Sequence, residues 1–77
     1  MGDGEVDPEA FLMAVGKRIR ILRLTREMTQ DELAAAAGIS RSFVSLVEHG
    51  AKGIDVVRLM RIAAALDVPL PELVQPP

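Results

Sequence analysis

Gly38 separates two stretches of sequence that each begin with a helix-start signal, and this feature limits the fold more than any other. Before it, Thr29 and Glu32 match the capping box, in which a hydroxyl caps the backbone and the carboxylate three residues later reaches back. Glycine ends a helix readily because it adopts the left-handed conformation without steric penalty. After it, Ser40 is a preferred helix N-cap. The sequence therefore predicts two short helices joined by a sharp corner at Gly38.

Three further helices are predicted, so the fold class is all-α with five helices. Asp7 can cap the first helix, and Pro8 suits its first position. Asp55 caps a later one, and Pro69 and Pro71 bound a short last helix. The predicted helices cover residues 8–26, 30–37, 41–49, 56–66 and 70–74. Apolar residues recur at helical spacing in the longer segments, and β-alternation and repeats are absent from the sequence.

The 77 residues leave room for one domain, which we place at residues 8–75. Residues 1–7 are rich in glycine and acid with little to bury, and they are predicted to be a mobile tail. A domain of this size buries only about 60% of its unfolded surface, so a partner is expected to add stability. The initial Met and the late prolines favour a complete short protein, and a fragment of a longer regulator is the alternative.

Composition excludes several classes of function. The chain has no cysteine and one histidine, which rules out a disulfide framework and a thiolate metal site, and we expect neither cofactor nor metal. No apolar run approaches the roughly 20 residues of a membrane span, and the N-terminus is acidic where a signal peptide is basic. We therefore expect a soluble cytoplasmic protein with no membrane partner and no evident small-molecule ligand.

Basic residues gather in the middle of the chain. Although the net charge is −2, all nine Lys and Arg residues lie between Lys17 and Arg61. Residues 16–61 hold these nine and only five acidic residues, which gives this stretch a net charge of +4. A basic middle between acidic ends is compatible with a surface that faces phosphate.

Two helices joined by a short turn that contains glycine form a helix-turn-helix unit. Close crossing of the helices requires a small residue at Ala34, and the corner takes an apolar plug at Ile39. Packed in this way, the helix after Ser40 presents its first residues outward. A DNA major groove about 12 Å wide can accept such a helix.

The run from Gln30 to Gly50, QDELAAAAGISRSFVSLVEHG, resembles the signature of the Cro and phage-repressor family, the XRE-type regulators. The flanking segments GKRIRILR and LMRIAAAL resemble the neighbouring helices of that family, so the likeness covers about residues 14–74. It implies a five-helix, lambda-repressor-like domain of bacterial or phage type. The implied function is sequence-specific binding to double-stranded DNA as a transcriptional repressor or controller, by a homodimer on a pseudo-palindromic operator.

The resemblance also implies roles for individual residues. Base-reading positions correspond to Arg41, Ser42, Ser45 and Leu46. Phosphate-contacting positions correspond to Thr29, Gln30, His49 and Lys52, of which Gln30 would also brace the recognition helix. Arg23 and Glu48 resemble a buried ion pair that ties the first helix to the end of the third.

The chemistry of these side chains agrees with reading a groove. Arg41 has the planar fork that reads guanine O6 and N7, a contact worth about 1 to 3 kcal/mol of discrimination. Leu46 offers only apolar contact, for instance to a thymine methyl, so readout is expected to depend on Arg41 and on DNA shape. Phe43 either touches DNA in the same way or belongs partly to the core.

Later apolar residues are the predicted dimer surface, although the same residues are also candidates for the monomer core. They are Val57, Met60, Ala64, Val68, Leu70, Leu73 and Val74. The alternative function on the same fold is an antitoxin-like or anti-repressor module whose main partner is a protein. An enzyme is not expected: Ser45 and His49 share a helix face, but Glu48 is turned about 100° away and cannot orient the imidazole.

Overall fold

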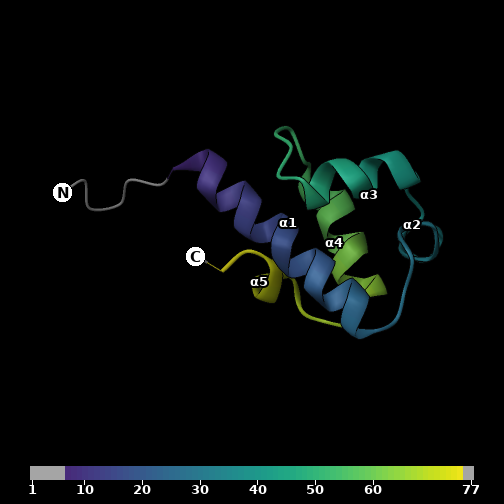
Figure 1. The fold of residues 1–77 in the computed structure, drawn as a ribbon. Helices are drawn as coiled ribbons and strands as arrows, with labels where there is room; N and C mark the ends of the chain where they lie inside the picture. The colour runs from purple at the N-terminus through teal and green to yellow at the C-terminus, as the bar shows by residue number, and fades with distance from the viewer. Residues whose placement is uncertain (1–6, 76–77) are drawn as a thin grey trace.

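The computed structural model describes residues 7–75, and this part of the chain forms five helices without a strand. Their bounds are α1 Pro8–Thr25, α2 Gln30–Ala37, α3 Arg41–Glu48, α4 Val56–Ala65 and α5 Leu70–Leu73. The predicted all-α, five-helix class is confirmed. Figure 1 shows α1 as a long diagonal rod, with α2, α3 and α4 grouped on one side of it and α5 beside its middle.

Side-chain caps start the helices as the sequence predicts. The Thr29 hydroxyl accepts a hydrogen bond from the Glu32 amide at 3.0 Å, and the Glu32 carboxylate accepts one from the Thr29 amide at 2.8 Å. Ser40 accepts from the Phe43 amide at 3.0 Å, which caps α3. These bonds satisfy backbone donors that have no partner within the helix, so α2 and α3 begin at defined residues.

The corner between α2 and α3 has the predicted backbone geometry. Gly38 has φ 69° and ψ 37°, in the left-handed region, and its amide donates to carbonyls of the last turn of α2. The chain turns there, and Ser40 already caps the next helix. Ile39 is half-buried against the core, as an apolar plug requires.

Helix ends differ from the predictions by one residue in several places. Arg26, His49 and Leu66 are C-caps rather than the last helical residues, and Val74 follows α5. In the predicted tail, residues 1–6 lie outside the described part of the chain. Asp7 belongs to the start of α1, because its carboxylate accepts hydrogen bonds from the Glu9 and Ala10 amides.

Apolar side chains from all five helices form a single core. Its fully buried members include Val15, Ile19, Leu33, Val44, Val47, Ile62, Leu66 and Leu73. Three small residues, Ala34, Ala37 and Ala63, let α2 and α4 pack closely against their neighbours. The core therefore holds α3 by its inner face against α1 and α2.

The prediction of the dimer surface was wrong for one residue, Leu73. Leu73 has an exposed fraction of 0%, so it belongs to the monomer core and has no surface for a second subunit. Val68, Leu70 and Val74 are partly buried against the same core. Only Val57, Met60 and Ala64, all on α4, are exposed as the prediction requires. The short α5 thus completes the monomer, because it packs against both α1 and α4.

Candidate nucleic-acid interface

The two faces of α3 differ sharply in burial. Val44 and Val47 point into the core and are fully buried. Arg41 and Ser42 are exposed, Ser45 is half-buried, and Leu46 is 56% exposed despite its apolar side chain. The structure thus brings the predicted base-reading positions together on the solvent side of one helix, next to its capped N-terminus.

Arg41 is held loosely at the start of α3. Its guanidinium Nε lies 3.6 Å from a carboxylate oxygen of Asp31 in the first turn of α2, and both side chains are mostly exposed. An exposed pair of this kind contributes at most about 1 kcal/mol to stability. A stronger acceptor can therefore draw the guanidinium away, and Asp31 was not among the residues that the sequence singled out.

Phe43 has one of the two roles considered for it, because its ring belongs partly to the core. Its ring is partly buried against the core, and the guanidinium of Arg58 lies 4.4 Å from the ring centroid. Arg58 also pairs with Asp55 at 3.1 Å in the first turn of α4. This stacking joins the outer edge of α3 to the start of α4, a contact that the sequence pattern did not indicate.

A buried polar junction ties three helices together. Arg23 of α1 donates to both carboxylate oxygens of Glu48 at the end of α3, at 2.6 and 3.1 Å, and to the Met28 carbonyl at 2.8 Å. The two side chains are only 8% and 2% exposed. Gln30, the first residue of α2, adds a hydrogen bond to Glu48 at 3.2 Å. The end of α3 is thereby fixed to α1 and to the start of α2.

Arg23 stays protonated over the whole ordinary pH range. The hydrogen bond with Glu48 raises the pKa of Arg23 above its ordinary value, although burial acts in the opposite direction. A raised pKa for a basic group means that its stabilising effect is present at neutral pH and is lost only as the pH rises through strongly alkaline values. Arg23 therefore contributes no pH dependence of stability near neutrality.

The four predicted phosphate contacts surround α3 but are differently engaged. The amide of Gln30 is turned to Glu48, while Thr29 is exposed and uses its hydroxyl as a cap. His49 is exposed, and its Nδ1 lies 2.7 Å from the Ser45 carbonyl, so this nitrogen carries the proton and donates. Lys52, in the loop after α3, lies 3.8 Å from Glu9 with both side chains exposed.

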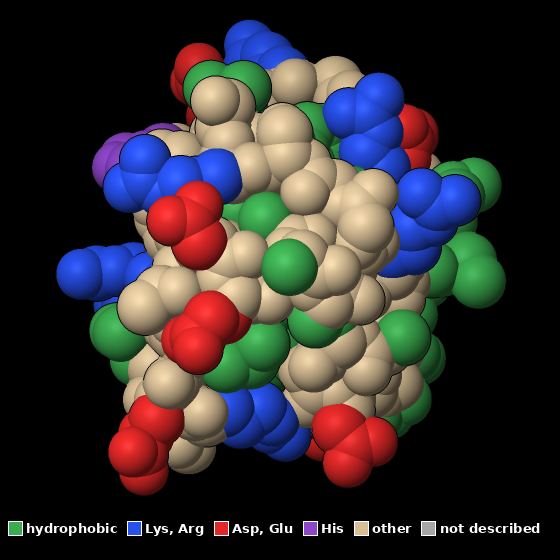
Figure 2. All heavy atoms as spheres, turned by 90° about the vertical axis from the view of Figure 1, so that its right-hand side faces the viewer, with side chains coloured by type: hydrophobic (Ala, Val, Ile, Leu, Met, Phe, Trp, Pro, Cys, Tyr) green, Lys and Arg blue, Asp and Glu red, His purple; other side chains and the backbone are tan. Residues whose placement is uncertain are grey.

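Basic side chains frame one face of the molecule. Figure 2, which views the fold from the α2 side, shows Lys and Arg side chains mostly around the edge, with apolar patches among backbone and other side chains in the middle. Acidic side chains are interspersed, in keeping with the exposed pairs of Arg41 and Lys52. The positive charge is thus distributed along the rim of this face rather than concentrated at one point.

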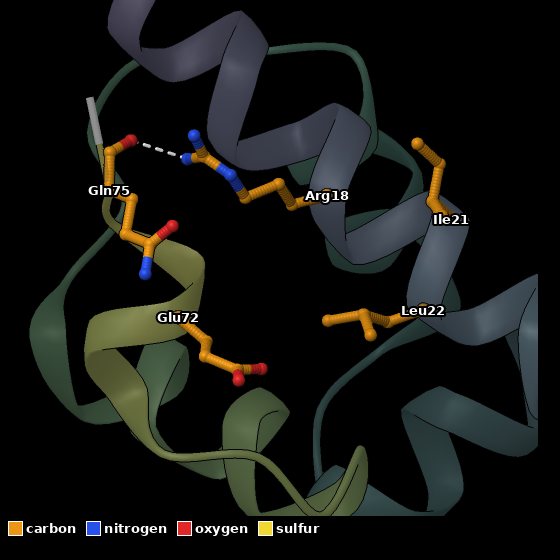
Figure 3. A pocket seen from close by; sticks show the side chains of 5 residues that line it. All are labelled: Arg18, Ile21, Leu22, Glu72 and Gln75. Carbon is orange, nitrogen blue, oxygen red and sulfur yellow. Dashed lines mark hydrogen bonds between the residues drawn. The ribbon is translucent and has the colours of Figure 1, made fainter. Parts of the chain in front are cut away.

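Two hollows lie along α1. One, of about 250 Å³, is lined by Arg18, Ile21, Leu22, Glu72 and Gln75. Figure 3 shows Arg18 reaching across it to the backbone carbonyl of Gln75, which attaches the segment after α5 to α1. The other, of about 410 Å³, lies between α1 and the end of α3 and is lined by Met13, Ala14, Lys17, Arg20, Glu48 and His49.

Neither hollow has the donor set of a metal centre. Within residues 7–75, no three His, Asp or Glu side chains gather closely enough to hold a metal ion. No helix among these residues is long and apolar enough to cross a membrane. What the arrangement offers is an exposed helix face, flanked by basic side chains and fixed from behind.

Comparison with known proteins places this architecture among regulators. The helix-turn-helix family HTH_3 matches residues 19–73. An HTH-type transcriptional regulator of Sinorhizobium fredii is 37% identical over 62 residues, which cover 80% of each chain. These proteins form a family of DNA-binding transcriptional regulators rather than a class of enzymes.

Solved structures agree in fold. The restriction-modification controller protein C.AhdI of Aeromonas hydrophila is 37% identical with a TM-score of 0.77, over 80% of this chain and 94% of that one. SinR, described as the master regulator for biofilm formation and solved in complex with DNA, is 29% identical with a TM-score of 0.74, over 79% of this chain and 98% of that one.

Proposed function

The chain belongs to the helix-turn-helix family HTH_3 of transcriptional regulators, and we therefore propose that it binds double-stranded DNA sequence-specifically with α3 in the major groove. One observation supports this most directly. Arg41, Ser42 and Leu46 are exposed on a helix whose other face is fully buried. A helix anchored in this way can enter a groove about 12 Å wide without rearrangement of the core.

Arg41 is the proposed base reader. It stands in the first turn of α3, its side chain is 66% exposed, and its partner Asp31 holds it only weakly. The guanidinium is long enough to reach base edges and has the donor fork that matches guanine. Ser42 and Ser45 add short polar contacts, and Leu46 adds an apolar one.

Phosphate contacts are proposed for the residues that flank α3. Lys52 and His49 lie at the end of the helix and in the loop that follows it, and Thr29 stands at the start of α2. Gln30 is proposed to approach the backbone with the part of its amide that Glu48 does not use. Such contacts set the register of α3 on the duplex, while the base contacts select the sequence.

We propose that the chain acts as a homodimer through α4. Val57, Met60 and Ala64 recur at helical spacing and are all exposed, with Val57 59% and Met60 54% exposed. One head reads too few bases for high specificity, whereas two heads about 34 Å apart read both halves of a pseudo-palindromic operator. By occupying such a site in a promoter, the dimer would act as a repressor or controller.

The test is retention of genomic DNA fragments by the purified protein at two salt concentrations. We expect a limited set of fragments that share an inverted repeat and are released steeply as salt rises, because phosphate contacts release counterions. Retention of a protein partner and of no DNA fragment would refute DNA binding and favour the antitoxin-like or anti-repressor alternative.

A further inference from the structure

The larger hollow shares only His49 with the surface assigned above, and it adjoins the end of the recognition helix. Lys17 and Arg20 of α1 line it together with His49, the C-cap of α3. We propose that Lys17 and Arg20 form a second phosphate-binding surface that holds the DNA backbone outside the half-site. This inference rests on the proposed DNA-binding function and extends it to DNA that α3 does not read.

Among residues 7–75, the charges of this surface have no carboxylate partner, unlike three other exposed basic side chains. Arg41, Lys52 and Arg58 each lie within 3.8 Å of a carboxylate. Lys17 and Arg20 are exposed, and no carboxylate among residues 7–75 forms an ion pair with either. An anion that arrives at these two side chains therefore displaces no carboxylate of residues 7–75.

The one acidic residue that lines the hollow, Glu48, does not cancel the positive charge of Lys17 and Arg20. Glu48 lines the hollow, but its side chain is 2% exposed and bonded to the guanidinium of Arg23. His49 donates through Nδ1 to the Ser45 carbonyl, which leaves its other ring nitrogen for a solvent-side partner. The hollow thus presents an ammonium and a guanidinium that no carboxylate among residues 7–75 pairs with, and both groups donate hydrogen bonds that phosphate oxygens accept.

The length of α3 determines where the hollow would lie relative to bound DNA. Its eight residues place the two ends about 12 Å apart at 1.5 Å per residue, which matches the width of the major groove. With Arg41 at the bases, His49 comes to the sugar–phosphate backbone at the groove edge. Lys17 and Arg20 continue from His49 onto α1, so they face the next stretch of backbone.

The close packing of α1 on α3 makes this continuation rigid. A Cβ built on Gly16 would lie 2.3 Å from the Val47 carbonyl oxygen, so the α1 backbone touches the last turn of α3 at this point. Lys17 is the next residue, and Arg20 follows three positions later on the same side of α1. Lys17 and Arg20 are therefore held at a fixed distance from α3.

The experiment compares two duplexes and two variants of the full chain. One duplex ends at the outer edges of the operator, and the other extends about five base pairs, half a helical turn, beyond each edge. The variants are Lys17→Ala/Arg20→Ala and, as a matched control that keeps both charges, Lys17→Arg/Arg20→Lys. Thermal unfolding by circular dichroism verifies that both variants fold.

We expect wild type and the control to bind the extended duplex more tightly and with a steeper salt dependence than the short one. In the alanine variant this advantage should vanish, and the slope of log affinity against log salt should fall by about 1.8 per half-site for two lost phosphate contacts. Between 50 and 200 mM salt, that change in slope corresponds to a factor of about 12 in affinity for one half-site and of about 150 for an operator with two half-sites.

Two results would overturn the inference, and they differ in what else they affect. If the alanine variant loses the same factor on both duplexes, the two residues act only through the general charge of the protein, and the proposed function stands. If wild type binds neither duplex nor any genomic fragment, the proposed function fails together with this extension of it.

Discussion

At the scale of single residues, the buried ion pair of Arg23 and Glu48 matters for the stability of the fold, whereas the exposed ion pairs contribute little to it. Arg23 is 7% exposed, so its charge is tolerated only because Glu48, Gln30 and the Met28 carbonyl surround the ion pair with polar groups. Removal of one member leaves a desolvated charge without compensation. The exposed pairs, by contrast, exchange readily with solvent or with a ligand.

Glu48→Ala should lower the free energy of unfolding by about 3 to 5 kcal/mol, because it leaves the Arg23 guanidinium buried and unpaired. Urea denaturation followed by circular dichroism measures the change. Glu72→Ala is the matched control: this glutamate is exposed and forms no ion pair among the described residues. Equal effects for the two variants would show that the junction does not stabilise the fold.

Arg41→Ala and Lys52→Ala should weaken DNA binding in different ways. Loss of a base-reading guanidinium should cost about 1 to 3 kcal/mol and relax the preference at one operator position, whereas loss of a phosphate contact should weaken all sequences alike and reduce the salt slope by about one. Selection of bound sequences from a random library compares the two. An unchanged preferred sequence in Arg41→Ala would contradict the assignment of the reading position.

Asp31→Asn tests whether the pair with Arg41 damps contact with DNA. Because both side chains are more than 60% exposed, the variant should leave stability within about 0.5 kcal/mol of wild type. It should nonetheless increase affinity for DNA, since Arg41 no longer has an internal competitor. The matched control is the double variant with Arg41→Ala, in which Asp31→Asn should have a clearly smaller effect on binding, measured by fluorescence anisotropy.

Residue types alone predicted some of these contacts and missed others. The Thr29, Ser40 and Asp55 caps depend on local backbone geometry, which short sequence patterns describe well. The Arg23–Glu48 pair came from the family resemblance, since 25 residues separate its members. The contacts of Arg58 with Phe43 and of Gln30 with Glu48 depend on side-chain rotamers, for which the sequence carries no signal.

At the scale of helices, the crossing of α1 over α3 depends on Gly16. A Cβ there would lie 2.3 Å from one carbonyl oxygen and 2.8 Å from the next, both belonging to backbone that cannot swing away. Gly38 is a different case, because nothing lies within 4 Å of a Cβ there. A substitution at Gly38 would therefore cost only the strain of a left-handed backbone. The same substitution thus probes packing at one site and backbone strain at the other.

Gly16→Ala should destabilise the protein more than Gly38→Ala. Strain in a left-handed residue costs about 1 to 2 kcal/mol, whereas Gly16→Ala must push two helices apart and open the core between Val15 and Val47. Thermal unfolding of the two variants ranks them directly. A reversed order would mean that α1 can shift over α3 at little cost.

The starts of helices were easier to predict than their ends. Each start has a side-chain cap or a proline, but α1 and α4 are followed by Glu27 and Asp67 in left-handed conformations at φ 56° and 58°. The sequence offers no glycine at these two positions, so the usual stop signal is absent. The end points were therefore predicted from apolar spacing alone, which defines them to within about a turn.

At the scale of the whole molecule, the exposed apolar residues of α4 are the feature least explained by the monomer. Val56, Val57 and Met60 are each more than half exposed on one helix. Sequence could not separate this surface from the core, because Leu73 is equally apolar and lies entirely inside. The burial of Leu73 depends on how α5 folds back onto α1 and α4. This contact joins residues far apart in the sequence, so no local sequence pattern indicates it.

Met60→Glu should shift the protein from dimer to monomer and weaken operator binding, because charges on both copies would have to be desolvated at the α4 surface. Analytical ultracentrifugation across a concentration series measures the shift. Leu24→Glu, at a 52% exposed apolar site on α1, is the matched control and should leave the dimer intact. Dissociation by the control alone would move the interface to α1.

The separation of the two faces of α3 has an evolutionary consequence. Val44, Val47 and Glu48 face inward and hold α3 in place, whereas Arg41, Ser42 and Leu46 are exposed. Under the proposed function, the target sequence can therefore change by exchange of a few exposed side chains, at little cost to the stability of the fold. Duplicated copies of such a gene could acquire new operators while every ancestral packing contact is retained.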